Sequence, residues 1–154
     1  MKKLALGLVG IIIVLVGLLL VMSQDSSKTL YKDAPTVLYA DIEDDLAGTN
    51  YYYIYKEDCS WCVKIKPDIA KYYYNKPEDV DFYLIDAANL QNINDGFELQ
   101  PSEGFVTPSG TVESYKDIQA TGTPTLVEIT DGEITNFVVG GKSIPEFLTT
   151  LETA

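Results

Sequence analysis

The hydrophobic pattern of the chain begins with one long uninterrupted apolar run. Lys2 and Lys3 precede 19 uncharged residues, from Leu4 to Met22. At about 1.5 Å per residue, a helix of this length spans roughly 28 Å, which is close to the thickness of a bilayer core. The two lysines should stay in the cytoplasm and leave the rest of the chain outside. Residues 1–22 are therefore predicted to form an N-terminal transmembrane anchor.

A cleaved signal peptide is the alternative to an anchor. Val21 and Ser23 are small enough for cleavage before Gln24, which would give a secreted form. The run is longer than a usual signal core, and this favours an uncleaved anchor. Both alternatives place the rest of the chain outside the cytoplasm. Residues 23–34 are polar and without periodicity, so we expect a tether there and a single domain over residues 35–154.

Within the domain, the pattern alternates between strand-like and helix-like segments. Short apolar runs predict strands at 36–40, 50–56, 79–86, 125–130 and 133–139, the last two joined by a turn at Asp131-Gly132. Helical spacing predicts helices at 58–75, with Asp58 as the N-cap, and at 143–151. A short acidic helix or turn is expected at 41–48, and another short helix from Ser109 or Thr111 to Ile118. The order predicts an α/β fold with one mixed sheet and helices on both faces.

The charge of the chain excludes several classes of function. Beyond Lys2 and Lys3, 9 basic residues face 23 acidic ones, a net charge of −14. Nucleic acids and anionic lipids are bound through basic patches, so neither is an expected partner. The chain has no histidine. This removes the commonest general base and metal ligand, and with it histidine-based triads and zinc sites.

The candidate chemistry lies in the only two cysteines, Cys59 and Cys62, at a predicted strand-to-helix junction. A spacing of three residues places both side chains on one face of a helix. Cys59 would lie at the helix N-terminus, where free N–H groups and the helix dipole favour a thiolate. Cys62, one turn further, would attack a mixed disulfide formed on Cys59. We therefore expect Cys59 to be the nucleophile and Cys62 the resolving thiol.

Three alternative roles of the cysteine pair are less favoured by the pattern. A structural disulfide across one helical turn would constrain the unfolded chain very little. A metal site needs about four ligands, and this pair supplies two, so no metal is expected. Two inert core cysteines would more often lie away from such a junction. A redox centre is the interpretation that the pattern favours.

At this point the chain resembles the thioredoxin family. Pro67 lies five residues beyond Cys62, where thioredoxins carry a proline that kinks the helix, and residues 121–148 are similar to the closing segment of the family. The resemblance implies a three-layer thioredoxin-like fold, a cis peptide bond at Thr123-Pro124 facing the cysteines, and a backbone at Thr123 that binds substrate. It also makes Ser60, Trp61, Thr123 and Pro124 the expected substrate-binding residues. No cofactor is implied.

The departures from the family are specific. Thioredoxins have a tryptophan just before the first cysteine, where this chain has Asp58, and Trp61 lies inside the motif. Tyr53 occupies the place of a buried aspartate that assists proton transfer in thioredoxins. Glu57 and Asp58 should oppose ionisation of Cys59, and the nearby lysines are expected to offset this effect. The direction of electron flow, as reductant or oxidant, is left open.

The resulting hypothesis is an extracytoplasmic thiol–disulfide oxidoreductase acting on protein or peptide substrates, with a membrane or extracellular redox partner. Its layout resembles that of the small membrane-anchored accessory thioredoxins of Gram-positive bacteria. A non-catalytic peptide-binding module of the same fold and a redox sensor are the alternatives. The loop at 89–105 is expected either to form a substrate-selecting wall beside Cys59 or to be a plain surface loop.

Overall fold

Strand β1 (Thr49–Tyr55) occupies the inside of a five-stranded mixed sheet with the order β2-β1-β4-β5-β3. It pairs in parallel with β2 (Val80–Asp86) and antiparallel with β4 (Thr125–Thr130). β4 continues antiparallel into β5 (Glu133–Val139), and the edge strand β3 (Gly110–Thr111) pairs with β5. The mixed α/β sheet predicted from the sequence is thus confirmed.

This computed structural model describes residues 29–44 and 46–152. The predicted anchor, residues 1–22, and the first part of the predicted tether lie outside the described residues. Within the described part, no helix is both long and apolar enough to cross a membrane.

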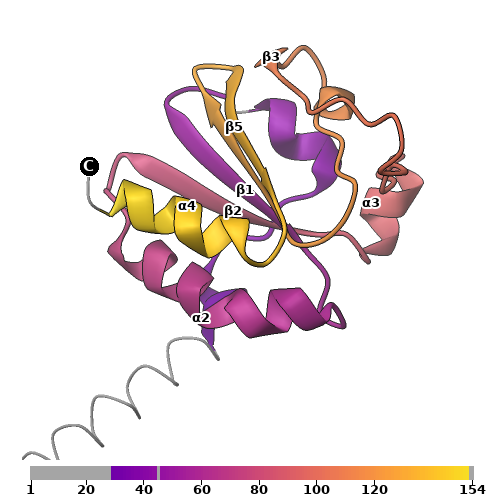
Figure 1. Cartoon of the computed structure of the whole chain (residues 1–154). Helices are drawn as coiled ribbons and strands as arrows, with labels where there is room; N and C mark the ends of the chain where they lie inside the picture. The colour runs from indigo at the N-terminus through magenta and orange to yellow at the C-terminus, as the bar shows by residue number, and fades with distance from the viewer. Residues whose placement is uncertain (1–28, 45, 153–154) are drawn as a thin grey trace, which may run out of the picture.

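The side chains of β1 alternate between two apolar layers and are buried in both. Tyr51, Tyr53 and Tyr55 face one layer, which contains α2 (Ser60–Asn75) and α4 (Ser143–Leu151). Tyr52 and Ile54 face the other, which contains the 3-10 helices η1 (Tyr39–Asp44) and η2 (Tyr115–Asp117). Figure 1 shows α2 and α4 together on one side of the sheet. Burial on both faces explains why β1 is apolar and aromatic without alternation.

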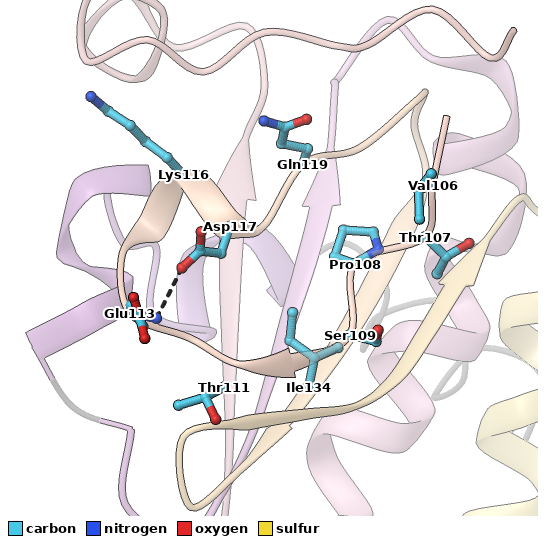
Figure 2. A pocket seen from close by; sticks show the side chains of 10 residues that line it. All are labelled: Val106, Thr107, Pro108, Ser109, Thr111, Glu113, Lys116, Asp117, Gln119 and Ile134. Atoms are coloured by element: carbon cyan, nitrogen blue, oxygen red, sulfur yellow. Dashed lines mark hydrogen bonds between the residues drawn. The ribbon is translucent and has the colours of Figure 1, made fainter. Parts of the chain in front are cut away.

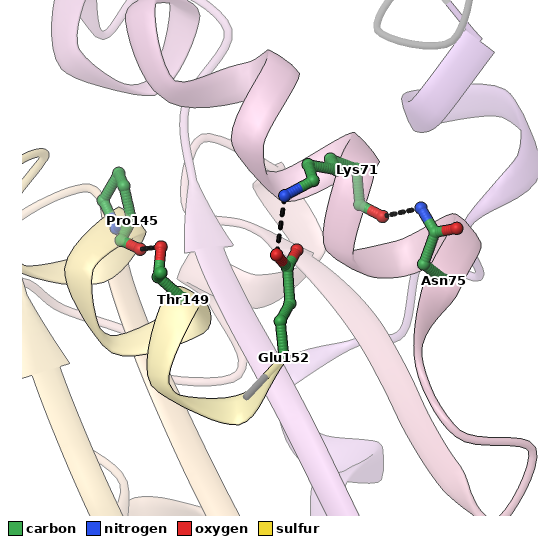
Figure 3. Close-up of polar contacts among 5 residues, drawn as sticks. All are labelled: Lys71, Asn75, Pro145, Thr149 and Glu152. Atoms are coloured by element: carbon green, nitrogen blue, oxygen red, sulfur yellow. Dashed lines mark hydrogen bonds and ion pairs between the residues drawn. The ribbon is translucent and has the colours of Figure 1, made fainter. Parts of the chain in front are cut away.

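Helix α4 lies against α2 and is joined to its solvent side by one ion pair. The Nζ atom of Lys71 lies 2.6 Å from a carboxylate oxygen of Glu152 (Figure 3). In the same region, the side chain of Asn75 donates to the backbone carbonyl of Lys71, and Thr149 donates to that of Pro145. Because Lys71 is largely exposed, its ion pair contributes at most about 1 kcal/mol. The apolar contacts beneath it hold α4 in place.

Residues 29–34 belong to the domain, so the prediction of a tether is wrong for this segment. Residues 29–33 are helical, and Leu30 and Ala34 are buried in the layer of α2. The hydroxyls of Tyr73 and Tyr74, near the end of α2, bond to the backbone and the carboxylate of Asp33. These partners lie about forty residues away along the chain, which is why the segment looks featureless in the sequence.

Two predicted elements are replaced by shorter ones. Of the expected strand at 36–40, only Thr36 forms a bridge, parallel to Leu84 of β2, and η1 begins at Tyr39. The expected helix ending at Ile118 is reduced to η2, capped by Ser114 rather than by Ser109 or Thr111. The side chains and backbones of Ser114 and Asp117 form a capping box, which fixes this late start.

One buried amide holds the first part of the segment between β2 and β4. This part contains α3 (Leu90–Asn94), a short helix in a region predicted to be irregular. The side chain of Asn92 in α3 accepts a hydrogen bond from the backbone N–H of Tyr39 at 2.7 Å. It also donates to the backbone carbonyl of Asp86 at 2.8 Å. The amide therefore ties α3 both to η1 and to the end of β2.

From β4 onward the chain agrees closely with the sequence pattern. β4, β5 and α4 have the predicted bounds. Asp131 and Gly132 both have positive φ, as a two-residue hairpin turn between right-twisted strands requires. Helix α2 continues through Pro67 and changes direction along its length (Figure 1). Proline lacks the N–H that would bond to Val63, which accounts for this bend.

Candidate active site

Cys59 is the N-cap residue of α2, one residue later than the predicted cap at Asp58. Its backbone is extended, and its sulfur accepts a hydrogen bond from the backbone N–H of Cys62 at 3.2 Å. The thiol therefore takes the place that a serine or aspartate oxygen normally occupies at a helix start. Both cysteines are free thiols. The sequence prediction was right about the helix N-terminus and wrong about which residue caps it.

The loop before β4 brings Thr123 against Cys59. The Thr123-Pro124 peptide bond is cis, as the resemblance implied. The Cys59 sulfur lies 3.3 Å from the backbone carbonyl oxygen of Thr123 and donates to it. Pro124 is buried, and its carbonyl accepts from the backbone N–H of Gly140 at 2.9 Å. Residues 64 positions apart in the sequence thus meet at one sulfur.

The two thiols have opposite electrostatic environments. Burial acts to raise the pKa of Cys59, but hydrogen bonds with Cys62, with the side chain of Thr123 and with the backbone of Trp61 outweigh it, and the net pKa is lowered. Burial and the hydrogen bond with Cys59 raise the pKa of Cys62 to about 11. Cys62 is fully buried, whereas Cys59 is partly exposed. The accessible sulfur is therefore the one that ionises first.

The charged residues beside the motif have a smaller effect on the pKa of Cys59 than the sequence suggested. Burial and hydrogen bonds, not Glu57 or Asp58, have the strongest effects on the pKa of Cys59. Two of the lysines expected to offset that charge lie over aromatic rings. The Nζ atom of Lys64 is 4.5 Å from the Trp61 ring centroid, and that of Lys66 is 3.8 Å from the Tyr31 centroid. Cation–π contacts thus hold these lysines at the side of α2.

The two residues between the cysteines are both exposed. Ser60 lies on the first turn of α2, and the Trp61 side chain is 39% exposed. The indole packs against Gly141, where an added Cβ would lie 2.4 Å from a ring carbon. Trp61 and Gly141 also line a surface hollow of about 370 Å³. In the sequence, Gly141 marks only the end of a strand, and no periodic signal points to this contact.

The position where thioredoxins carry a buried aspartate is filled by a buried tyrosine. Tyr53 lies on β1 with no exposed surface, in the same apolar layer as Cys62. Its ring stacks on that of Tyr55, with centroids 5.9 Å apart, and Tyr55 in turn stacks on Tyr31. Burial, followed by the charge that Cys62 carries as a thiolate, raises the pKa of Tyr53 far above its usual value. The sequence shows the departure from the family but not this contact.

A second hollow lies away from the cysteines. It has a volume of about 520 Å³ and is lined by residues around β3 and η2 and by Ile134 of β5 (Figure 2). Glu113 and Asp117, on its wall, are joined by a hydrogen bond from the Glu113 backbone. Neither cysteine contributes to it. The hydrogen bonds that hold the loop at residues 89–105 run to η1, β2 and η2, and also from Gln100 to the carbonyl of Ala120 in the segment before β4. Its role as a substrate-selecting wall stays a prediction.

Among the described residues, no group of three or more histidine, cysteine, aspartate or glutamate side chains is placed to hold a metal ion. The groups with the strongest effects on the two thiols include the backbone of α2 and the loop at Thr123, and Tyr53 lies beside Cys62. The site is thus built around sulfur and hydrogen-bonding groups. This arrangement supports chemistry on the sulfur atoms themselves.

Comparison with known proteins gives structural matches only. No family model and no characterised protein sequence matches the chain. Mitochondrial thioredoxin 3 from Saccharomyces cerevisiae superimposes with a TM-score of 0.52 at 17% identity, over 80% of this chain and 98% of the other. Spinach chloroplast thioredoxin f gives 0.51 at 15% identity, over 84% and 92%.

A third match comes from a structural study of the thiol resolving mechanism in yeast mitochondrial 1-Cys peroxiredoxin, which proceeds via glutathione/thioredoxin systems. Its TM-score is 0.54 at 15% identity, over 80% of this chain and 98% of the other. At such identities the likeness establishes the fold. The chain has a thioredoxin-like α/β fold with a mixed five-stranded sheet.

Proposed function

We propose that this protein is a thiol–disulfide oxidoreductase that exchanges disulfides with protein substrates through Cys59 and Cys62. The observation that carries the proposal is the inequality of the two thiols. Cys59 is partly exposed, caps a helix and has a lowered pKa, whereas Cys62 is fully buried and has a raised one. An attacking thiol needs access and thiolate character, and a resolving thiol needs only to reach the first sulfur.

The reaction takes two steps of sulfur exchange. The Cys59 thiolate attacks one sulfur of a substrate disulfide, forms a mixed disulfide, and releases the other substrate sulfur as a thiolate that takes up a proton. Cys62 then loses its proton and attacks the Cys59 sulfur. The bond between Cys59 and the substrate breaks, and the second substrate thiol leaves. The substrate disulfide is reduced by two electrons, Cys59 and Cys62 become a disulfide, and the reverse sequence oxidises a substrate dithiol.

The backbone at Thr123 is suited to hold the substrate during these steps. In the free protein its carbonyl accepts the Cys59 S–H. When the Cys59 sulfur bonds to a substrate it no longer carries that hydrogen, and the carbonyl becomes free for an N–H of the substrate backbone. An extended substrate segment would pair there in the manner of an added strand. Pro124 and the exposed Ser60 and Trp61 would lie beside this segment.

The proposal includes the site of action. The apolar run of residues 4–22 after Lys2 and Lys3 supports an anchor with the domain outside the cytoplasm, as in the small accessory thioredoxins of Gram-positive bacteria. A membrane-impermeant maleimide added to intact cells should then label Cys59, and the label should remain in the membrane fraction. Label found only in the medium would indicate cleavage after Ser23. Labelling only after lysis would refute the outward orientation.

Trapping of the mixed disulfide tests the chemistry. Cys62→Ser should accumulate a covalent complex between Cys59 and a disulfide-bonded peptide, visible as a dithiothreitol-sensitive mass shift. Cys59→Ser is the matched control and should form none, because the remaining thiol is buried and has a raised pKa. If neither variant forms a complex while the peptide still binds, the protein is a peptide-binding module and the proposed reaction is wrong.

The redox potential decides the direction of electron flow. Equilibration of the domain with a series of glutathione ratios, followed by alkylation of the free thiols, gives this potential. A value near about −270 mV would make the protein a reductant and require a membrane electron donor, whereas a value near about −120 mV would make it an oxidant with an oxidising partner. The sulfurs carry the electrons in either direction, so the proposed reaction uses no cofactor.

A further inference from the structure

The hydroxyl of Tyr53 is an unusual atom in this fold. Tyr53 lies in the middle of β1 and is fully buried. Among residues 29–44 and 46–152, its hydroxyl is the one buried side-chain oxygen or nitrogen that has no hydrogen-bond partner of standard geometry. A buried polar group without a partner destabilises the folded state, and such groups often have a functional reason. A phenylalanine would fill the same space without this cost.

Cys62 is the side chain with the strongest effect on the pKa of this hydroxyl. Both residues are fully buried in the same apolar layer, Tyr53 from β1 and Cys62 from α2. Burial has the strongest effect on the pKa of the phenol, and Cys62 has the next strongest. The two side chains thus belong to the same buried cluster, and in the reduced protein the phenol makes no hydrogen bond of standard geometry.

The other groups that face Cys62 do not neutralise a charge on it. Burial and the hydrogen bond with Cys59 raise the pKa of Cys62, and hydrogen bonds with the backbone of Lys56 and the side chain of Thr123 lower it; no cationic side chain is among the groups with the strongest effects. Tyr31 lies in the helical segment at residues 29–33. Its pKa is raised first by burial and Tyr55, and then by Cys62, Glu57 and Cys59. When Cys62 becomes a thiolate, its charge thus forms in an apolar layer that also contains Tyr31, Tyr53 and Tyr55. The hydrogen bonds with Lys56 and Thr123 do not offset burial and the effect of Cys59, so a further hydrogen-bond donor would stabilise the thiolate.

We propose that Tyr53 is a positioning residue for the resolving step: its phenol donates a hydrogen bond to the Cys62 sulfur and stabilises the negative charge that forms there before attack on Cys59. This inference rests on the proposed function. The phenol keeps its own proton throughout. The proton of Cys62 leaves to solvent or to the departing substrate sulfur, while the Cys62–Cys59 bond forms and the bond from Cys59 to the substrate breaks.

The chemistry of the phenol fits a donor and not a base. Burial holds the Tyr53 proton on its oxygen far above neutral pH, so the group offers an O–H at every pH at which the protein is folded. A carboxylate at the same place would be an acceptor once ionised and would repel the thiolate. Because the donated bond strengthens only when the sulfur is charged, it favours the reacting state over the resting thiol.

The test is Tyr53→Phe, which removes one oxygen and keeps the ring. Mixed disulfide formation by Cys59 should stay within about twofold of wild type, whereas its resolution by Cys62 should slow about tenfold or more, the loss expected for one hydrogen bond to a charged group. The pH profile of resolution should move to higher pH. Acid-quenched single turnovers with a disulfide-bonded peptide, separated by mass, measure both steps.

Stability provides the readout that separates this role from a structural one. Since the hydroxyl has no partner in the resting protein, Tyr53→Phe should unfold at the same urea concentration as wild type or a higher one. Tyr55→Phe is the matched control, because Tyr55 lies on the same strand and stacks on Tyr53, but Cys62 is not among the groups with the strongest effects on the pKa of its phenol. It should resolve the mixed disulfide at the wild-type rate.

Each outcome decides the matter. Wild-type resolution by Tyr53→Phe, with an unchanged pH profile, overturns the role of Tyr53 and leaves the proposed function intact. A Tyr53→Phe protein that loses stability or fails to fold also overturns it, because the hydroxyl would then have a structural partner. If Cys62→Ser traps no substrate at all, the proposed function fails first, and the role of Tyr53 fails with it.

Discussion

Trp61 lies so close to Gly141 that a single methyl group would not fit between them. An ideal Cβ at Gly141 would be 2.4 Å from one ring carbon of the indole and 2.8 Å from another. Trp61 belongs to the cysteine motif at the start of α2, and Gly141 lies between β5 and α4. The contact therefore connects the residue beside Cys62 to the C-terminal part of the fold.

Gly141→Ala should displace the indole of Trp61. Because the side chain is 39% exposed and has room to swing outward, we expect a modest loss of stability, about 1 kcal/mol. The tryptophan is the only one in the chain, so its fluorescence should shift toward a solvent-exposed spectrum. Reduction of a protein disulfide should slow several-fold, while alkylation of Cys59 by a small reagent should not.

Gly122→Ala is the matched control for this change. Gly122 also lies near the site, on the loop before Thr123, but an added Cβ there meets nothing within 4 Å. Its fluorescence spectrum and stability should equal those of the wild type. An unchanged indole spectrum in Gly141→Ala would show that the contact between Trp61 and Gly141 does not hold the indole.

The two thiols should ionise in separate pH ranges. In Cys62→Ser, the rate of iodoacetamide alkylation of Cys59 should rise with a midpoint below 9.0, the ordinary value for a thiol, because hydrogen bonds from the start of α2 lower its pKa. In Cys59→Ser, the midpoint for Cys62 should lie well above that value, because burial raises its pKa. The urea-unfolded variants serve as controls and should give equal midpoints. Coinciding midpoints in the folded variants would contradict the assigned roles.

The elements that the sequence predicted well are those fixed by neighbours along the chain. The Asp131-Gly132 turn and the strands on either side depend on local turn chemistry and alternation, and they were confirmed. The strand expected at 36–40 does not form, because η1 begins at Tyr39 and its apolar side chains pack in the layer that contains η1 and η2. Residues 29–34 were missed because their partners, Tyr73 and Tyr74, come from the far end of α2.

In the candidate site, too, the sequence predicted the features that short motifs determine and did not predict those that depend on packing between separate elements. Cys59, Cys62 and Thr123 were expected to meet, since two short motifs carry them, and the structure brings them together. The cap at Asp58 was wrong because the helix begins one residue later, with a thiol in the capping place. The contacts of Tyr53 and of Gly141 depend on how close two elements approach. The spacing of residues along the sequence does not predict how closely two separate elements pack.

Asn92 should be a point of high sensitivity in the segment between β2 and β4. Asn92→Ala removes the acceptor for the buried N–H of Tyr39 and the donor to the carbonyl of Asp86. Each buried group left without a partner costs about 1–3 kcal/mol, so we expect a loss in that range or somewhat above. Urea unfolding measures it. Asn94→Ala, on the exposed side of α3, should change stability by no more than about 0.5 kcal/mol. Equal losses in the two variants would remove the anchoring role.

The buried tyrosines should make the fold sensitive to alkali. Burial raises the pKa of Tyr55 to about 12 and holds those of Tyr51 and Tyr53 higher still, whereas in the unfolded chain each phenol ionises near 10.0. Above that pH the unfolded state has released more protons than the folded one, so stability falls by about 1.4 kcal/mol per pH unit for each such phenol. The part of the tyrosinate absorbance that comes from these buried residues should therefore rise together with loss of the circular dichroism signal. Tyr51→Phe should make the decline with pH shallower, and Phe82→Leu, which alters the same core without a titrating group, should leave its slope unchanged. Ionisation of all eleven tyrosines near pH 10.0 with an intact fold would refute the assigned burial.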